Sequence, residues 1–251
     1  IENVSTERLK IFYDTYYWPN NATVTVIGDF NKKDALASIN KHFSEHSKSK
    51  EPIPPVYTDE PEQEGPRRIT VKRTGQTGIV GIAHKTPKGL HEDTYSLQVL
   101  GKILADGKTS RLNKLIIDKG LATSIFMYDF PFLDNGLFIT YAFLTPGTDH
   151  KKIEDIIIKE YNNILQNGVT KEEIKRAQAQ IRATVAFSRD GTYAVASALN
   201  EAIAIGDWTF YTKFMDNINK VNEEKIKEVI KKYFTEDQST TGWFIAREPK
   251  N

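Results

Sequence analysis

The stretch ILADGKTSRLNKLIIDKGLAT, residues 103–123, separates a helical pattern from a strand pattern and decides the fold class. Before it, apolar residues recur at helical spacing and predict a helix over about 92–105. Inside it, the polar turn 106–110 leads to a second expected helix over 111–119. After it, ATSIFMYDF and GLFITYAFLT are rich in β-branched and aromatic residues, which predicts two strands joined around 134–136.

Further strand patterns precede this stretch, and helical patterns follow it. RRITVKR from Arg67 and GIVGIAHKT from Gly78 predict two strands, and QSTTGWFIAR from Gln238 predicts a last one. Thr170 and Glu173 have the spacing of a capping box at the start of a long helix. The expected helices cover about 149–166, 170–190, 192–205, 207–218 and 222–234. Strands in groups and helices in runs predict an α+β fold, with helices covering one face of a mostly antiparallel sheet.

The first part of the chain has a pattern of its own. Ser5 is suited to cap a helix that runs to about Tyr17, and Asn31 is suited to cap another. Between them, ATVTVIGDF from Ala22 alternates and is β-branched, so we expect a strand.

A proline-rich segment separates this first part from the rest. Half of the ten prolines fall within residues 52–66, where they disfavour helices and central strands. We therefore expect a linker at 47–66, the tail of a preceding α+β domain at 1–46, and a complete second α+β domain at 67–251.

An internal comparison supports this division. VSTERLKIFYDTYYWPNNATVTVIG from Val4 aligns without gaps on VNEEKIKEVIKKYFTEDQSTTGWFI from Val221, at an offset of 217 residues. Both segments read as a helix, a turn and a strand. The chain is then expected to hold the end of one unit, cut from something longer, followed by one whole unit of the same kind.

Composition excludes several function classes. The formal net charge of +1 gives no general field for nucleic acid, and no apolar run is long enough for a membrane span. The chain has no cysteine, so disulfides, thiolate metal sites and a cysteine nucleophile are excluded. Absence of cysteine favours a bacterial periplasmic location without identifying one.

Three segments together are similar to a known family. FYDTYYWPNNATVTVIGDF, ILADGKTSRLNKLIIDKGLAT and LQNGVTKEEIKRAQAQ resemble, in order and spacing, segments of the pitrilysin/insulinase-like zinc metallopeptidases, the inverzincins. The resemblance implies a metallopeptidase-half domain of the LuxS/insulinase-like type, two of which form half of a clamshell. It also implies that zinc belongs to a first domain carrying HxxEH, so no cofactor is expected in this segment.

His42-Phe43-Ser44-Glu45-His46 nevertheless spells the H-x-x-E-H motif. In the family that motif lies well upstream of the VIGD segment, whereas here it lies downstream. It also runs directly into the expected linker, and the window for the family's third zinc ligand, 116–126, offers only Asp118. We interpret the segment as a solvated helix end and predict no metal site.

The resemblance also bears on peptide contacts. Active members often supply an Arg and a Tyr from the non-zinc half, but the matching positions hold Ile116 or Ile117 and Thr123. No catalytic residue is therefore predicted. Arg111 and Tyr128 are kept as candidate substrate-binding residues, although a structural role for Arg111 is also open.

Two functions remain open at this point. The chain is expected to be the non-catalytic C-terminal portion of a zinc endopeptidase, closing a peptide chamber and helping to bind extended peptide. Its expected partners are then the peptide and either the missing N-terminal domain or a zinc-bearing subunit. The alternative is a non-proteolytic scaffold or assembly subunit of the same fold.

Overall fold

The computed structural model describes residues 3–55 and 61–247. Residues 1–61 with 191–196 make one compact unit, and residues 62–190 with 197–251 make the other. The larger unit contains the sheet and most of the helices.

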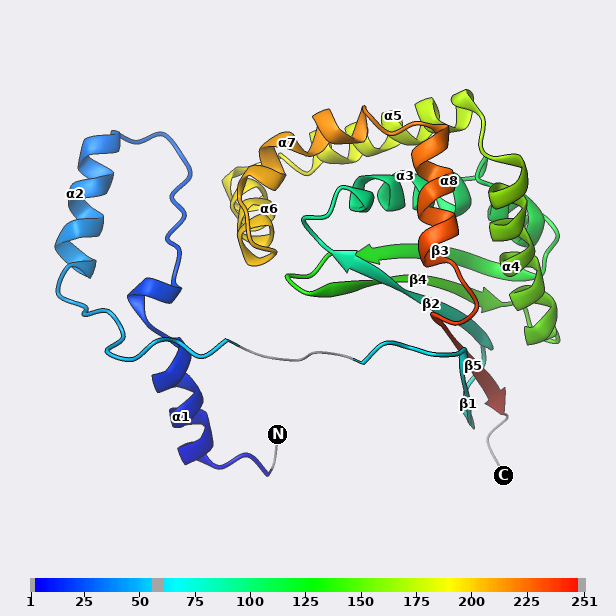
Figure 1. Ribbon diagram of the computed structural model, residues 1–251, viewed down its shortest axis with the longest axis horizontal. Helices are drawn as coiled ribbons and strands as arrows, with labels where there is room; N and C mark the ends of the chain where they lie inside the picture. The colour runs from blue at the N-terminus through cyan, green and yellow to red at the C-terminus, as the bar shows by residue number, and fades with distance from the viewer. Residues whose placement is uncertain (1–2, 56–60, 248–251) are drawn as a thin grey trace. The chain divides into compact units, whose positions relative to one another are not determined.

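A five-stranded sheet is the centre of the larger unit (Figure 1). Its order is β1-β5-β2-β4-β3, in which only β1 and β5 are parallel neighbours and every other pair is antiparallel. The sequence prediction of a mostly antiparallel sheet is therefore confirmed. The strands are β1 Arg67–Thr74, β2 Ile79–Lys88, β3 Ala122–Phe130, β4 Asn135–Leu144 and β5 Ser239–Arg247.

Helices cover one face of this sheet (Figure 1), as expected from the sequence. On β2 and β4 buried side chains alternate with partly exposed ones, so each strand gives one face to the core. The core includes Ile82 and Phe138 from the sheet, and Leu100 and Ile157 from the helices. Helices α3 Asp93–Ala105, α4 His150–Asn167 and α8 Glu223–Tyr233 contact the sheet, and α5 Lys171–Phe187 and α7 Thr209–Ile218 pack on α3. Helix α6, Thr192–Ala204, connects α5 to α7 along the chain.

The helix expected over 111–119 is shorter and wider than predicted. After a first helical turn, Asn113–Ile117 form a π-helical turn, closed by the Asp118 N–H donating to the Asn113 carbonyl at 3.0 Å. Gly120 then has a φ of 69°, a conformation that favours glycine, and the chain turns directly into β3.

In the smaller unit, the two helices agree with their predicted caps. Helix α1, Thr6–Tyr16, begins after Ser5, whose side chain accepts from the Arg8 N–H, and α2, Lys32–Phe43, begins after Asn31. A short 3-10 turn, Pro19–Asn21, follows α1.

The strand predicted at 22–30 is wrong, because these residues lie in no sheet. Val24 and Val26 are 50% and 44% exposed. A strand needs neighbouring backbones to satisfy its N–H and C=O groups. The aligned segment at 239–247 has such neighbours, since β5 lies between β1 and β2.

The internal repeat is nevertheless visible in the helices. Helix α1 spans residues 6–16 and α8 spans 223–233, the same interval at the same offset. Each begins after a capping side chain, Ser5 or Asn222. Helical hydrogen bonds close within the segment, so the helix forms in both contexts, whereas the strand forms only in one.

The proline-rich segment has no helix or strand at 47–55 or 61–66, and residues 56–60 lie outside the described residues. Its last part is not simply exposed: Gln63 is buried and donates to the carbonyls of Gly65 and Ser239 at 2.9 and 2.7 Å. Across the described residues, no helix combines the length and hydropathy needed to cross a membrane.

Candidate functional site

The HFSEH segment does not have the geometry of a zinc-binding helix. Helix α2 ends at Phe43, and Glu45 and His46 lie in the turn after it. His42 and His46 are therefore not one helical turn apart on a continuous helix, which is what two such ligands require. All three motif side chains are exposed, and within 3–55 and 61–247 no three His, Asp or Glu side chains cluster as metal ligands do. These residues do not fit a zinc ion.

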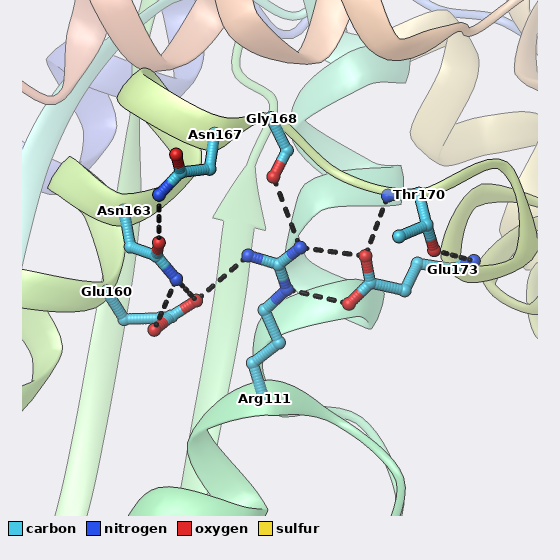
Figure 2. A network of polar contacts seen from close by, with 7 residues as sticks. All are labelled: Arg111, Glu160, Asn163, Asn167, Gly168, Thr170 and Glu173. Atoms are coloured by element: carbon cyan, nitrogen blue, oxygen red, sulfur yellow. Dashed lines mark hydrogen bonds and ion pairs between the residues drawn. The ribbon is translucent and has the colours of Figure 1, made fainter.

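Arg111 is the hub of a polar network within the helical layer (Figure 2). Its Nε and Nη2 donate to the two carboxylate oxygens of Glu173 at 2.6 and 2.8 Å. Its Nη1 donates to Glu160 at 3.0 Å, and Nη2 also donates to the Gly168 carbonyl at 3.2 Å. The guanidinium thus joins α4, the loop after it, and the start of α5.

The capping box predicted for α5 is part of this network. The Thr170 side chain accepts from the Glu173 N–H, and the Glu173 carboxylate accepts from the Thr170 N–H at 2.8 Å. Burial favours the neutral acid, but the hydrogen bonds from Arg111 and Thr170 outweigh it and lower the pKa of Glu173 to about 2. Glu173 is therefore a carboxylate at neutral pH.

The positions that match the family's Arg and Tyr lie in different surroundings. Ile116 is fully buried in the core, and Ile117 packs against it. Thr123 is exposed at the start of β3, and its hydroxyl donates to the Phe143 carbonyl at 3.2 Å. Nothing at these positions supplies a guanidinium or a phenol.

Tyr128 lies on the sheet face that the helices leave open. It is 48% exposed and belongs to a row of aromatic rings with Phe126, Phe130 and Phe132 at centroid distances of 5.9–6.3 Å. Arg111, by contrast, binds groups of the helical layer on the other side of the sheet (Figures 1 and 2). The structure therefore does not bring the two predicted peptide contacts together.

The open face is mainly apolar along its middle rows, from one edge of the sheet to the other. The strand registers place Ile69, Gly242, Gly81, Tyr141 and Phe126 in one row across all five strands. The next row holds Val71, Phe244, Ile79 and Phe143, and the row on the other side includes Thr240, Ala83, Ile139 and Tyr128. Side chains paired across strands point to the same face, so these residues form one surface.

Sequence reasoning missed a partly buried acid beside this surface. Asp129 follows Tyr128 on β3 but points to the other face, where the Gln98 amide donates to it at 3.2 Å. It lines a cavity of about 320 Å³ between α3 and β3, together with Lys102 and Asp106. Burial raises the pKa of Asp129 to about 7, and the Gln98 hydrogen bond opposes this only in part. The strand pattern predicted β3 but gave no sign of this burial.

A second missed cluster lies under α4. The Arg68 guanidinium donates to both oxygens of the buried Glu154 at 2.8 and 2.6 Å, and the Trp243 indole donates to the same carboxylate at 2.9 Å. Arg68 also lies 5.1 Å from the centre of the Trp243 ring. These contacts join β1, β5 and α4, and they neutralise the buried charge.

Comparison with known proteins identifies related chains. Residues 3–181 match the family described as "Peptidase M16 inactive domain". The chain is similar to zinc protease PqqE of Helicobacter pylori, with 26% identity over 244 residues, which is 96% of the chain and 55% of that protein. It is similar to "Uncharacterized zinc protease YmxG" of Bacillus subtilis, with 23% identity over 238 residues, 92% of the chain and 56% of that protein.

Solved structures agree with these matches. The crystal structure of a protease from Helicobacter pylori has a TM-score of 0.90 at 26% identity, and the alignment covers 97% of the chain and 60% of that protein. The chain thus spans little more than half the length of the relatives it matches.

Proposed function

The chain belongs to the peptidase M16 family, as an inactive domain of its zinc protease-like members, and we propose that it closes the peptide chamber of a zinc endopeptidase and helps to bind extended peptide. The relatives to which it is similar are named zinc proteases. Zinc would lie in the other domain, since the HFSEH segment here does not have the required geometry.

The open sheet face is the observation that carries this proposal. One side of the sheet is covered by helices, while the other presents exposed or partly exposed aromatic and aliphatic side chains on every strand. Phe126, Tyr128 and Phe130 are 43%, 48% and 38% exposed. An apolar surface of this extent usually marks an interaction site, and an extended peptide with apolar side chains is a fitting partner.

The two candidate contacts have unequal access to such a peptide. Tyr128 presents its ring and hydroxyl on the open face. Arg111 has side-chain contacts to Glu160, Glu173 and Gly168, and it would have to release some of them to bind substrate. We therefore assign peptide contact to Tyr128 first, with Arg111 maintaining the helical layer behind the sheet.

The N-terminal part supports the domain organisation proposed here. Helix α1 repeats α8 at the same offset, and the segment after it repeats β5 in sequence without pairing in a sheet. We propose that residues 1–46 complete a preceding domain of the same fold, in which residues 22–30 become a strand. That domain, or a zinc-bearing subunit, is the expected partner.

Reconstitution of proteolysis tests the proposal. The chain is combined with a zinc-bearing M16 domain that has an intact HxxEH motif, and cleavage of an unstructured peptide is followed. We expect the chain to raise the cleavage rate, and Tyr128→Ala to raise KM more than it changes kcat. Phe187→Ala, which alters an 81% exposed ring outside the sheet, is the matched control. A stable complex with no cleavage would favour the scaffold alternative instead.

A further inference from the structure

Two glycines form a gap in the otherwise continuous side-chain surface of the open face. Gly81 of β2 and Gly242 of β5 are directly opposite each other in the antiparallel register. Ile69 follows Gly242 in the same row on one side, and Tyr141 follows Gly81 on the other. Along the strands, Ile79 and Phe244 border the two glycines at one end, and Ala83 and Thr240 border them at the other. We call this gap the glycine floor.

The space above the glycine floor is open. A Cβ added to Gly242 would have no atom within 4 Å, and one added to Gly81 would meet the Tyr141 ring at 3.4 Å, an ordinary contact distance. Neither glycine has a positive φ, so the backbone does not require glycine at either position. Glycine in a strand interior weakens the strand and often marks a place where another group approaches the backbone closely.

The surroundings of the floor indicate what could approach. The Tyr141 ring forms one wall, and the remaining border is aliphatic or aromatic apart from Thr240. A flat aromatic ring lying on two neighbouring glycines would contact exposed backbone below it and the Tyr141 ring beside it. Aromatic pairs with such offset contacts gain stability beyond the burial of their area.

The charges on this face have one sign. The residues that the registers place on it include Arg67, Arg73 and Lys85, and none of them is Asp or Glu. Both arginines lie on β1. Arg67 is in the row next to the glycine floor, and Arg73 is two rows away on the other side, beyond the row of Val71. Neither forms an ion pair with a described carboxylate. Guanidinium groups at the border of an apolar surface favour a ligand that carries carboxylates.

We propose that the glycine floor is a side-chain subsite which accepts an aromatic residue of an extended peptide that also carries Asp or Glu nearby. This inference rests on the proposed peptide-binding function and adds the class of residue that the open face selects. The glycines provide the depth, Tyr141 provides the aromatic wall, and Arg67 and Arg73 select the charge. Gly81 and Gly242 then act as specificity-determining residues.

The test is a peptide titration followed by NMR on the full chain, with the amide signals of Gly81 and Gly242 as reporters. The probes are blocked peptides with the sequences Glu-Ser-Phe-Ser-Glu, Glu-Ser-Ala-Ser-Glu and Lys-Ser-Phe-Ser-Lys. We expect the first to shift both glycine signals saturably and to bind about tenfold more tightly than the second, as burial of an aromatic side chain implies. The third should bind more weakly than the first, and added salt should reduce that difference.

Gly242→Val fills the floor and should reduce binding of the phenylalanine peptide to the level of the alanine peptide. The same variant should unfold at an equal or higher temperature than the parent, because valine is favoured in strands and its Cβ would have no atom within 4 Å. Ser124→Val, on the same face in the row of Phe143, is the matched control and should keep binding.

The outcomes separate this inference from the function it rests on. Equal affinity for the phenylalanine and alanine peptides, or unchanged binding by Gly242→Val, would overturn the subsite while leaving peptide binding by the open face intact. Absence of any saturable shift with all three peptides would overturn both. Shifts confined to residues outside the open face would also contradict the subsite.

Discussion

Arg111 and Glu173 are 62 residues apart in the chain, and they meet in a two-point contact with N–O distances of 2.6 and 2.8 Å. Both side chains are largely buried, with 18% and 15% of their surface exposed. The parallel hydrogen bonds fix the start of α5 against the turn that leads to β3, and Glu160 on α4 shares the same guanidinium. This contact holds three helical segments in place behind the sheet.

Replacement of Arg111 should therefore destabilise the fold. Arg111→Ala leaves Glu160 and Glu173 close together without their cation, and we expect a loss of about 3 kcal/mol in the free energy of unfolding. Chemical denaturation measures it. Lys151→Ala, which removes an exposed ion pair with Asp155 in α4, is the control and should leave the midpoint nearly unchanged. Equal effects of the two variants would show that Arg111 does not hold the helical layer together.

His84 should make the protein sensitive to mild acid. Its ring is buried against Phe234 and Tyr161, and its Nδ1 has no partner among the described residues. Burial lowers the pKa of His84 to about 4, below its usual 6.5, so the unfolded chain takes up a proton more readily. Stability is then complete above pH 6.5 and falls as the pH drops toward 4.

His84→Phe should remove this dependence. The variant keeps a ring in the same place. We expect the difference in free energy of unfolding, variant minus parent, to be about 2 kcal/mol larger at pH 5 than at pH 8. Thermal unfolding at both pH values gives the comparison. His91→Phe, at a partly exposed side chain, is the control. A parent protein with the same stability at both pH values would contradict the assignment.

Asp129 should act in the opposite direction. Burial raises the pKa of this acid to about 7, so the folded chain holds a proton that the unfolded chain has already released above pH 4. Stability from this group is therefore complete below about pH 4 and is lost progressively as the pH rises from there through 7. Asp129→Asn keeps an acceptor for the Gln98 amide without the charge, and its gain in stability over the parent should be about 2 kcal/mol larger at pH 8 than at pH 5. A gain that is the same at both pH values would show that Asp129 does not titrate in this range.

Gly136 should tolerate no side chain, in contrast to Gly242. A Cβ at Gly136, at the start of β4 and opposite Thr86 in the register, would lie 2.3 Å from the Phe130 carbonyl oxygen and 2.9 Å from the Thr86 hydroxyl. Gly136→Ala should therefore cost about 2–3 kcal/mol through strain in the paired backbones. Gly242→Ala, with nothing within 4 Å, should cost nothing measurable. Comparison of their unfolding midpoints checks the packing on both faces of the sheet.

Much of the larger unit could be predicted from the sequence because its signals are local. The helical spacing of Leu97, Leu100 and Leu104 corresponds to α3, and the alternation in GIVGIAHKT corresponds to β2. Thr170 and Glu173 lie close enough in the chain to form their capping box without help from other elements. The resemblance to the M16 segments was confirmed as well, since those segments are themselves local patterns.

The candidate site was harder to predict because its residues come together over long distances in the chain. Tyr128 and Asp129 are neighbours in sequence, but strand alternation places the Tyr128 ring on the open face and the Asp129 carboxylate beside Gln98 on the face that the helices cover. Which face is open depends on where the helices pack, and the pattern of β3 alone does not say so. Gly81 and Gly242 become neighbours only through the pairing of β2 with β5.

Local hydrogen bonding and side-chain spacing, read directly from the sequence, determined the helices of this protein and most of its strands. Residues 22–30 show the limit of that information, because they have a strand pattern like that of β5 but no sheet around them. The tertiary structure alone decided that Arg111 is enclosed by two carboxylates, that Asp129 is partly buried beside Gln98 and that one sheet face is open and mainly apolar. The reason is physical: a helix satisfies its backbone within itself, whereas a strand, a buried charge and a binding surface each depend on groups supplied from distant parts of the chain.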